Sequence, residues 1–262
     1  MMTSSKPSHL EPSPLGTKEY WDDLYTTELT NHALDTSDVG TIWFNDSSAE
    51  DKILPFLNQE ILENGTLGPS INRTNCSFLD LGTGNGHLLF RLRCVSGDED
   101  ENEEPWEGKM LGVDYSEKSV EFAKRIAEGH GLGTRDVEFK WWDIVSQIPT
   151  AASILGEEQE SGFDVVLDKG TFDAISLSEE KDAQGRRICE GYKEKVVPLI
   201  RPGGIFLVTS CNWTTEELKG WFEGGEGEMV LTVVGEIAYK RFTFGGAVGQ
   251  TISSVCFKRK LR

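Results

Sequence analysis

A glycine-rich turn after an apolar run holds the residues with the clearest chemical use. The segment SFLDLGTGNGHLL places Gly82, Gly84 and Gly86 directly after a run that contains Asp80 and ends at Leu81. Glycine permits a sharp turn and lets a ligand rest against bare backbone. A dinucleotide-binding turn has the spacing G-x-G-x-x-G and faces a pyrophosphate. Here the third glycine comes one residue early, and an acid precedes the turn.

This variant of the turn suits S-adenosylmethionine, which has no phosphate but carries an α-amino group that Asp80 could bind. An ordinary strand-to-helix turn would also contain glycines, so a second element is needed. The segment MLGVDYS supplies it, because its apolar run ends in Asp114, which could accept hydrogen bonds from both ribose hydroxyls. Tyr115 follows and could pack on the adenine or simply on the protein surface.

Two further acids follow apolar runs in the same way. In VEFKWWDIV, Asp143 could accept from the adenine amino group and Ile144 could cover the ring. In FDVVLDKGTFDAI, Asp168 ends a buried run. Ligands of open α/β sheets bind outside the carboxyl ends of the strands. We therefore expect Asp80, Asp114, Asp143 and Asp168 to converge on one edge of a sheet.

The elements that position these residues alternate along the chain. Strands followed by helices at this rhythm predict a Rossmann-like α/β fold, with a seven-stranded, mostly parallel sheet and helices on both faces. Two β-rich runs at the end, 229–239 and 250–258, read as an antiparallel pair that closes the sheet. The other expected strands are 76–81, 110–114, 137–142, 163–167 and 204–210, and the expected helices are 87–93, 117–128, 144–155 and 186–199.

The region before the sheet has a different character. Residues 1–16 contain no apolar stretch typical of a secretory signal, and we expect a disordered tail. Residues 17–63 predict a helical extension, with Thr17 as a helix cap. We thus expect a single domain over 17–262, with its Rossmann-like core at 76–262. The acidic stretch 98–104 reads as a solvated loop, or as a contact for a basic partner.

The charge of the chain limits the kinds of macromolecule that it can bind. The chain has 44 acidic and 26 basic residues, a formal net charge of −18, which repels a nucleic acid backbone and would attract a basic protein. Acidity that serves only solubility fits equally well. No apolar run is long enough for a membrane helix. The five cysteines form no C-x-x-C pair, so we expect no metal site and reduced thiols, as in a cytoplasmic enzyme.

Taken together, these motifs resemble the class I, seven-β-strand methyltransferases. More narrowly, the chain resembles the fungal and animal family of lysine methyltransferases that act on translation elongation factor 1-alpha, the Efm4 type. The narrow resemblance rests on YWDDLYTTEL, GTIWFND, LDLGTGNGHLL, LDKGTFDAISLS and TSCNWTTEEL, which span about Tyr20 to Leu218. The acidic stretch 98–104 departs from the family pattern without touching a ligand position.

The resemblance implies methyl transfer to a lysine ε-amine, with S-adenosylmethionine as the methyl donor. Asp168 and Asn212 are then the candidates for positioning the amine. Trp43, Phe44 and Trp213 are candidates for the wall of a lysine channel, although ordinary core aromatics would give the same pattern. Asp173 reads as an acid at a helix start.

Other functions remain open at this point. A nucleic-acid amino-methyltransferase would carry an Asn/Asp-Pro-Pro-aromatic segment where this chain has Asp168-Lys169-Gly170-Thr171. A small-molecule methyltransferase would share the cofactor site. A non-catalytic partner protein that binds the cofactor is the alternative from a different class. The methylated residue, the degree of methylation and the oligomeric state have no signature in the sequence.

Overall fold

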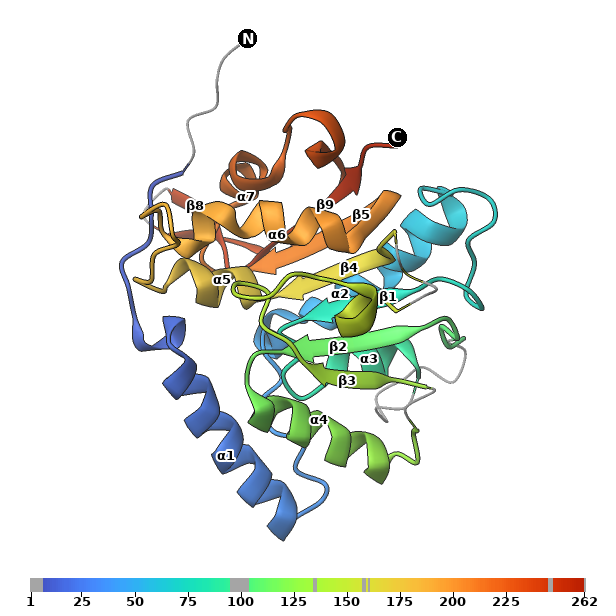
Figure 1. The fold of residues 1–262 in the computed structure, drawn as a ribbon, viewed down its shortest axis with the longest axis vertical. Helices are drawn as coiled ribbons and strands as arrows, with labels where there is room; N and C mark the ends of the chain where they lie inside the picture. The colour runs from blue at the N-terminus through green and yellow to red at the C-terminus, as the bar shows by residue number, and fades with distance from the viewer. Residues whose placement is uncertain are drawn as a thin grey trace.

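A mixed sheet forms the centre of the molecule. The computed structural model describes residues 7–94, 104–133, 136–156, 159, 161–244 and 247–261. Within these residues seven strands share one sheet in the order β3-β2-β1-β4-β5-β9-β6 (Figure 1). Neighbours from β3 to β5 are parallel, and β9 is antiparallel to both β5 and β6. The expected fold class is confirmed. The strands are β1 (Phe78–Leu81), β2 (Met110–Asp114), β3 (Glu138–Trp141), β4 (Phe163–Lys169), β5 (Ile200–Ser210), β6 (Leu231–Ile237) and β9 (Ser253–Arg259).

Helices cover both faces of this sheet. Side chains alternate along β5: Ile205 and Leu207 join the core beneath α1–α4, whereas Phe206 and Val208 join the core beneath α5–α7. Both faces of the sheet are therefore buried, which accounts for the continuous apolar runs in its strands. The helices are α1 (Lys18–Leu34), α2 (Ala49–Asn58), α3 (His87–Leu92), α4 (Glu117–Gly129), α5 (Thr171–Ser176), α6 (Tyr192–Val196) and α7 (Thr215–Phe222).

Several connections differ from the sequence expectation. The helix expected over 144–155 is wrong for its first half, because helical structure is confined to Ala151–Leu155. Asp143 accepts a hydrogen bond from the Val145 backbone at 2.9 Å, which fixes a turn, and Pro149 lacks the N–H that a continuing helix needs. The chain between β6 and β9 forms a separate hairpin of β7 (Arg241–Phe244) and β8 (Ala247–Gln250).

The start of the described chain is fastened to the domain. The Ser13 backbone donates to the Leu177 carbonyl at 3.1 Å, and the Arg187 guanidinium donates to the Leu10 carbonyl at 2.8 Å. A Cβ at Gly16 would lie 2.3 Å from the Leu177 backbone, so the two segments are in close contact. The expected disordered tail is thus wrong for residues 10–16, because their backbone finds partners in the loops around α5. Residues 1–6 lie outside the described chain, and the division into 17–63 and 76–262 stays a prediction.

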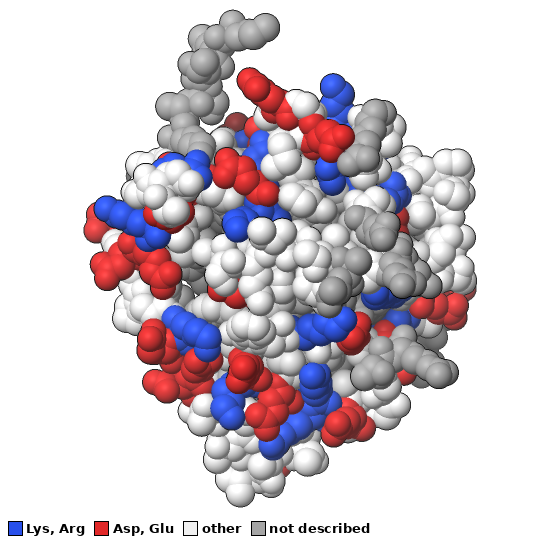
Figure 2. All heavy atoms as spheres, viewed as in Figure 1, with Lys and Arg blue, Asp and Glu red and all other residues white. Residues whose placement is uncertain are grey.

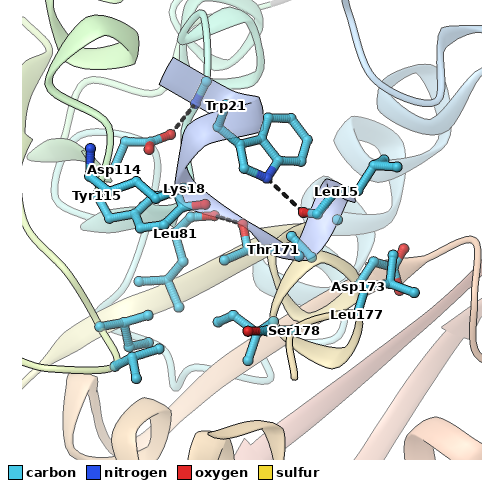
Figure 3. Close-up of a pocket in the computed structure, with 18 of the residues that line it drawn as sticks. Leu15, Lys18, Trp21, Leu81, Asp114, Tyr115, Thr171, Asp173, Leu177 and Ser178 are labelled. Carbon is cyan, nitrogen blue, oxygen red and sulfur yellow. Dashed lines mark hydrogen bonds between the residues drawn. The ribbon is translucent and has the colours of Figure 1, made fainter. Parts of the chain in front are cut away.

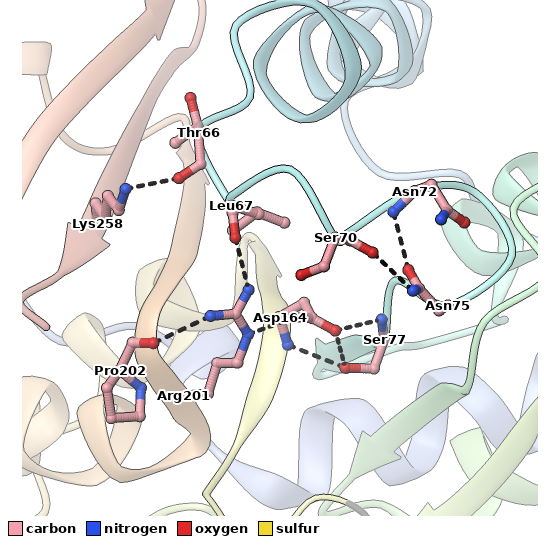
Figure 4. A network of polar contacts seen from close by, with 10 residues as sticks. All are labelled: Thr66, Leu67, Ser70, Asn72, Asn75, Ser77, Asp164, Arg201, Pro202 and Lys258. Carbon is pink, nitrogen blue, oxygen red and sulfur yellow. Dashed lines mark hydrogen bonds and ion pairs between the residues drawn. The ribbon is translucent and has the colours of Figure 1, made fainter.

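At the opposite end of the strands, a buried ionic network joins β1, β4 and β5 (Figure 4). The Asp164 carboxylate accepts from the Ser77 backbone at 2.8 Å and from the Ser77 hydroxyl at 2.7 Å. The Arg201 guanidinium pairs with the other Asp164 oxygen and donates to the Leu67 carbonyl at 3.1 Å. The network ties the loop before β1 to the sheet. Of the acidic stretch 98–104, residues 98–103 lie outside the described chain.

Candidate active site

A cavity of about 310 Å³ opens at the carboxyl ends of the parallel strands. This is the edge of an open α/β sheet where ligands bind. Figure 3 shows its wall, to which α1, the ends of β1 and β2, and α5 contribute. Of the residues predicted from the sequence, those that line the cavity are Trp43, Phe44, Gly82, Gly84, Asp114, Tyr115, Asp143, Ile144 and Asn212.

The glycine turn forms the floor of this cavity. Gly82 and Gly84 have φ angles of 63° and 59°, a backbone conformation that favours glycine. A Cβ at Gly82 would lie 2.0 Å from the Thr171 hydroxyl oxygen, which leaves no room for a side chain. Gly86 also has a positive φ, but it does not line the cavity: a Cβ there would strike Phe139. Gly86 thus packs against Phe139 of β3 and Phe90 of α3, and a contact between Gly86 and a ligand stays a prediction.

Asp114 presents a carboxylate that the protein already orients. The carboxylate accepts from the Ser116 backbone at 2.9 Å, from the Ser119 hydroxyl at 2.8 Å and from the Gly84 backbone at 3.2 Å. Burial nevertheless raises the pKa of Asp114. The next residue, Tyr115, lines the cavity and donates from its hydroxyl to the Thr17 carbonyl at 3.3 Å. Asp114 is thus held rigidly at one wall.

Asp143 and Ile144 lie at the far end of the cavity, after β3. The Ile144 side chain is 7% exposed, and the Trp142 side chain beside it is 3% exposed. The Asp143 carboxylate accepts hydrogen bonds from its own loop, from the Val145 backbone and, at 2.5 Å, from the Ser146 hydroxyl. This end combines apolar surface with one carboxylate, which suits a planar heterocycle that carries an amino group.

Asp80 lies behind the glycine turn and does not line the cavity. Burial raises its pKa to about 7, while the nearby charge of Lys169 opposes that rise. The Asp80 carboxylate therefore does not reach the cavity directly. Its charge lies one layer below Gly82 and can act on a ligand cation only through the turn.

Asp168 also lies outside the cavity, contrary to the sequence expectation. Its carboxylate accepts from the Tyr192 hydroxyl at 2.7 Å and from the Thr171 and Phe172 backbone at 2.9 and 3.2 Å. Burial raises its pKa to about 7. These contacts cap the first turn of α5 and turn the carboxylate toward Tyr192, so the Asp168 side chain does not line the cavity.

Trp213 is likewise a core residue. Its side chain is 3% exposed and stacks with Phe172, while its indole N–H donates to the Ser176 hydroxyl at 3.2 Å. It packs between α5 and α7 and does not line the cavity. The expectation that Trp213 forms part of a substrate channel is wrong, because the short helix α7 after Asn212 turns the indole inward.

Asp173, which the sequence predicted only as an acid at a helix start, lines the cavity. Asp173, in the first turn of α5, accepts from the Cys211 backbone at 2.8 Å and from the Ser210 hydroxyl. Burial raises its pKa. Asn212 and Cys211 line the same wall from the loop after β5. The spacing in DKGTFD was the available signal: Asp173 lies five residues beyond Asp168, on the other side of the helix start.

Comparisons with known proteins agree on one family. A family profile described as "Methyltransferase domain" matches residues 72–246. The chain is 40% identical to "Protein-lysine N-methyltransferase EFM4" of Saccharomyces cerevisiae over 251 residues, which cover 96% of this chain and 97% of that one. It is 33% identical to "EEF1A lysine methyltransferase 2" of Danio rerio over 255 residues, which cover 97% and 92% of the two chains. The chain belongs to the Efm4-type methyltransferases.

Solved structures support the same fold for this Efm4-type chain. The [4+2]-cyclase SpnF covers 98% of this chain and 100% of its own, with a TM-score of 0.58 at 14% identity, which is a likeness of fold alone.

The cofactor expected of an Efm4-type methyltransferase, S-adenosylmethionine, fits the residues present. At Gly82 and Gly84 the turn presents backbone to the cavity, and Thr171 and Tyr25 fill the space where a Cβ would lie. A buried carboxylate at Asp114 suits a ribose diol, and the apolar end at Ile144 suits an adenine. The wall also includes aromatic and basic residues that the sequence reading did not single out, namely Lys18, Trp21, Tyr25 and Lys169.

Proposed function

We propose that this chain is an S-adenosylmethionine-dependent protein-lysine N-methyltransferase that acts on translation elongation factor 1-alpha in the cytoplasm. The observation that carries the proposal is the 40% identity to a protein-lysine N-methyltransferase along nearly the whole of both chains. The vertebrate relatives named for EEF1A support the same substrate. No helix among the described residues combines the length and apolar character that a membrane span requires.

In this proposal the cavity divides into a cofactor half and a substrate half. Asp114 accepts the ribose hydroxyls, and Tyr115, Asp143 and Ile144 surround the adenine. Gly82 and Gly84 lie beneath the methionine end. The wall formed by Asp173 and Asn212 is left for the substrate amine.

The substrate half must hold a lysine without its proton. When bound, S-adenosylmethionine supplies a methyl group on a positively charged sulfur. A lysine side chain has a pKa near 10.4, so its neutral form lies roughly 4–5 kcal/mol uphill at pH 7. Asp173 can accept a hydrogen bond from the arriving ammonium, and the amide oxygen of Asn212 can orient the nitrogen. Much of the rate of such a transfer comes from orientation.

Aromatic side chains of the N-terminal region form the remaining wall. Trp21 on α1 and Trp43 line the cavity with ring centroids 5.3 Å apart in an edge arrangement, and Phe44 follows. Their faces can attract a lysine ammonium and the methylated products by cation–π contact.

The rim of the cavity is acidic. Figure 2 shows Asp and Glu side chains gathered over α1 and over the loop that follows α5, with Lys and Arg interspersed. Among them Glu19, Asp23, Glu179 and Glu180 are exposed, and Glu180 also lines the cavity. Complementary charge steers partners toward each other. A basic face of the substrate protein would therefore approach this rim.

The direct test is methyl transfer to purified, unmethylated elongation factor 1-alpha. We expect radiolabel from S-adenosylmethionine on that protein, located to a lysine by mass spectrometry. Label in the small-molecule fraction of a lysate, with none on any protein, would instead identify a small-molecule methyltransferase. Tight cofactor binding by calorimetry without turnover on any fraction would identify a non-catalytic partner protein.

A further inference from the structure

The methionine end of the cofactor carries a positive and a negative charge, and the cavity must provide a partner of opposite charge for each. The α-amino group lies above the buried Asp80 in the proposed orientation, and the α-carboxylate needs a cation. Lysines at two positions, Lys18 and Lys169, are the basic side chains among the described residues that line the cavity. Their exposure and their position in the cavity differ, and this difference shows which of the two can bind the α-carboxylate.

Lys18 belongs to the solvent-exposed mouth of the cavity. Its side chain is 46% exposed, pairs with Asp22 on the same helix and lies over the Tyr115 ring at 5.8 Å. Tyr115 follows Asp114 at the ribose wall, so Lys18 lies at the wrong end for a carboxylate on the methionine.

Lys169 lies at the back of the cavity and is 14% exposed. It ends β4, next to β1, in whose continuation the glycine turn lies. Its ammonium donates to the Trp43 carbonyl at 3.2 Å. An ammonium has three donors, and this bond is the one hydrogen bond that the described structure gives the Lys169 ammonium. Donors therefore remain for a ligand.

A buried acid behind Lys169 holds its ammonium in this place. Glu50 on α2 lies 3.5 Å from the Lys169 nitrogen and is 5% exposed. The second Glu50 oxygen accepts from His87 at 2.6 Å. Burial acts to raise the pKa of Glu50, but the bond from His87 and the charge of Lys169 lower it below its usual value. The Glu50 oxygen facing Lys169 has no hydrogen bond in the described structure, so Glu50 attracts the Lys169 ammonium by charge and does not occupy its N–H donors.

We propose that Lys169, held by the buried Glu50–His87 pair, binds the α-carboxylate of S-adenosylmethionine and is the residue that makes the cavity select a ligand with an intact methionine end. The cofactor's zwitterion then lies with its ammonium toward Asp80 and its carboxylate toward Lys169. The inference rests on the proposed cofactor but not on the identity of the substrate protein.

The test compares two ligands that differ only in the group concerned. Calorimetry measures the affinity of the purified protein for S-adenosylmethionine and for decarboxylated S-adenosylmethionine. We expect Lys169→Met to weaken binding of the first by about tenfold or more, the scale of a charged hydrogen bond, and to leave binding of the second within about threefold. Lys18→Met is the matched control and should change both affinities by the same factor.

The single change Lys169→Met leaves the buried Glu50 carboxylate without its positively charged partner Lys169, and this loss of stability can unfold the protein. The variant Lys169→Met/Glu50→Gln removes both charges together and should show the same loss of preference for the carboxylate. Equal weakening for both ligands, or no weakening for either, overturns the proposal. If the parent protein binds neither ligand, the cofactor assignment fails rather than the role of Lys169.

Discussion

Four buried aspartates surround the cavity, and their partners give each a different role. Asp114 and Asp173 line it with carboxylates that backbone and hydroxyl donors orient. Asp168 caps α5 and binds Tyr192 away from the ligand. Asp80 lies beneath the glycine turn. In the proposed site these four carboxylates are a cofactor contact, a substrate contact, a helix cap and a buried charge.

Asp114 should dominate cofactor affinity, because two ribose hydroxyls lose one charged acceptor when it is removed. We expect Asp114→Ala to weaken S-adenosylmethionine binding by about 2–3 kcal/mol, the scale of hydrogen bonds to charged groups. Calorimetry on a variant shown by circular dichroism to be folded measures this. An unchanged affinity would remove Asp114 from the site.

Asp173 and Asn212 should affect chemistry more than cofactor binding. We expect Asp173→Asn and Asn212→Ala to lower the single-turnover rate at saturating cofactor by tenfold or more, about 1.4 kcal/mol. Asp168→Asn is the matched control, because that side chain faces the core. If Asp168→Asn slows the chemical step more than Asp173→Asn does, the assignment of the amine contact is wrong.

Asp80 should make cofactor binding depend on pH. Its pKa of about 7 means that it is mostly protonated below that pH and ionised above it. Lys169 favours the ionised form, whereas Glu50 and Asp114 disfavour it. A cofactor ammonium prefers an ionised neighbour, so affinity should fall as pH drops through about 7. Calorimetry across this range should give a flat profile for Asp80→Asn. A parent profile that is already flat would contradict the idea.

The sequence predicted the residues that line the proposed cofactor half better than those that line the proposed substrate half, for a physical reason. Asp114 ends a strand, and the carboxyl ends of parallel strands meet at one edge whatever the loops do. Asp168 and Asp173 flank a helix start, so their directions depend on where that helix begins. Because α5 begins at Thr171, the Asp168 carboxylate meets free backbone N–H groups, and Asp173 takes the position facing the cavity.

At the scale of elements, apolar and β-rich runs predicted every strand of the main sheet, including the antiparallel pair at its end. The helix α7 was not expected from the sequence, and α5 was expected only as a helix start at Asp173, since runs of eight and six residues show a weak helical period. Residues 10–16 have no periodicity at all. Their order comes from tertiary contacts with Leu177 and Arg187, which local sequence does not encode.

The network at the other end of the strands should matter for stability and not for chemistry. Asp164→Ala leaves Arg201 and Ser77 without their buried acceptor, and we expect the free energy of unfolding to fall by about 3 kcal/mol. Urea denaturation measures it. Asp51→Ala, which breaks a pair between Arg91 and a 57% exposed carboxylate, is the control and should cost under about 1 kcal/mol. Equal effects would mean that the network does not hold the sheet.

At the scale of the whole molecule, the net charge of −18 should govern encounter with a basic protein. Exposed charges are screened beyond about 8–10 Å at physiological salt. Raising the salt concentration should therefore increase KM for the protein substrate more than it changes kcat. Steady-state methylation at several salt concentrations tests this, with cofactor affinity as the internal control. A flat response in KM would assign the acidity to solubility.

The N-terminal wall of the cavity has a consequence for how the molecule comes into being. Leu10 and its partner Arg187 lie 177 positions apart in the sequence. Contacts between such distant parts of a chain form late in folding, because closing a long loop costs entropy. Residues 10–16 can therefore take their place in the wall of the cavity only after residues 177–187 have been synthesised and have folded. A growing chain cannot hold its cofactor until most of its sequence has emerged.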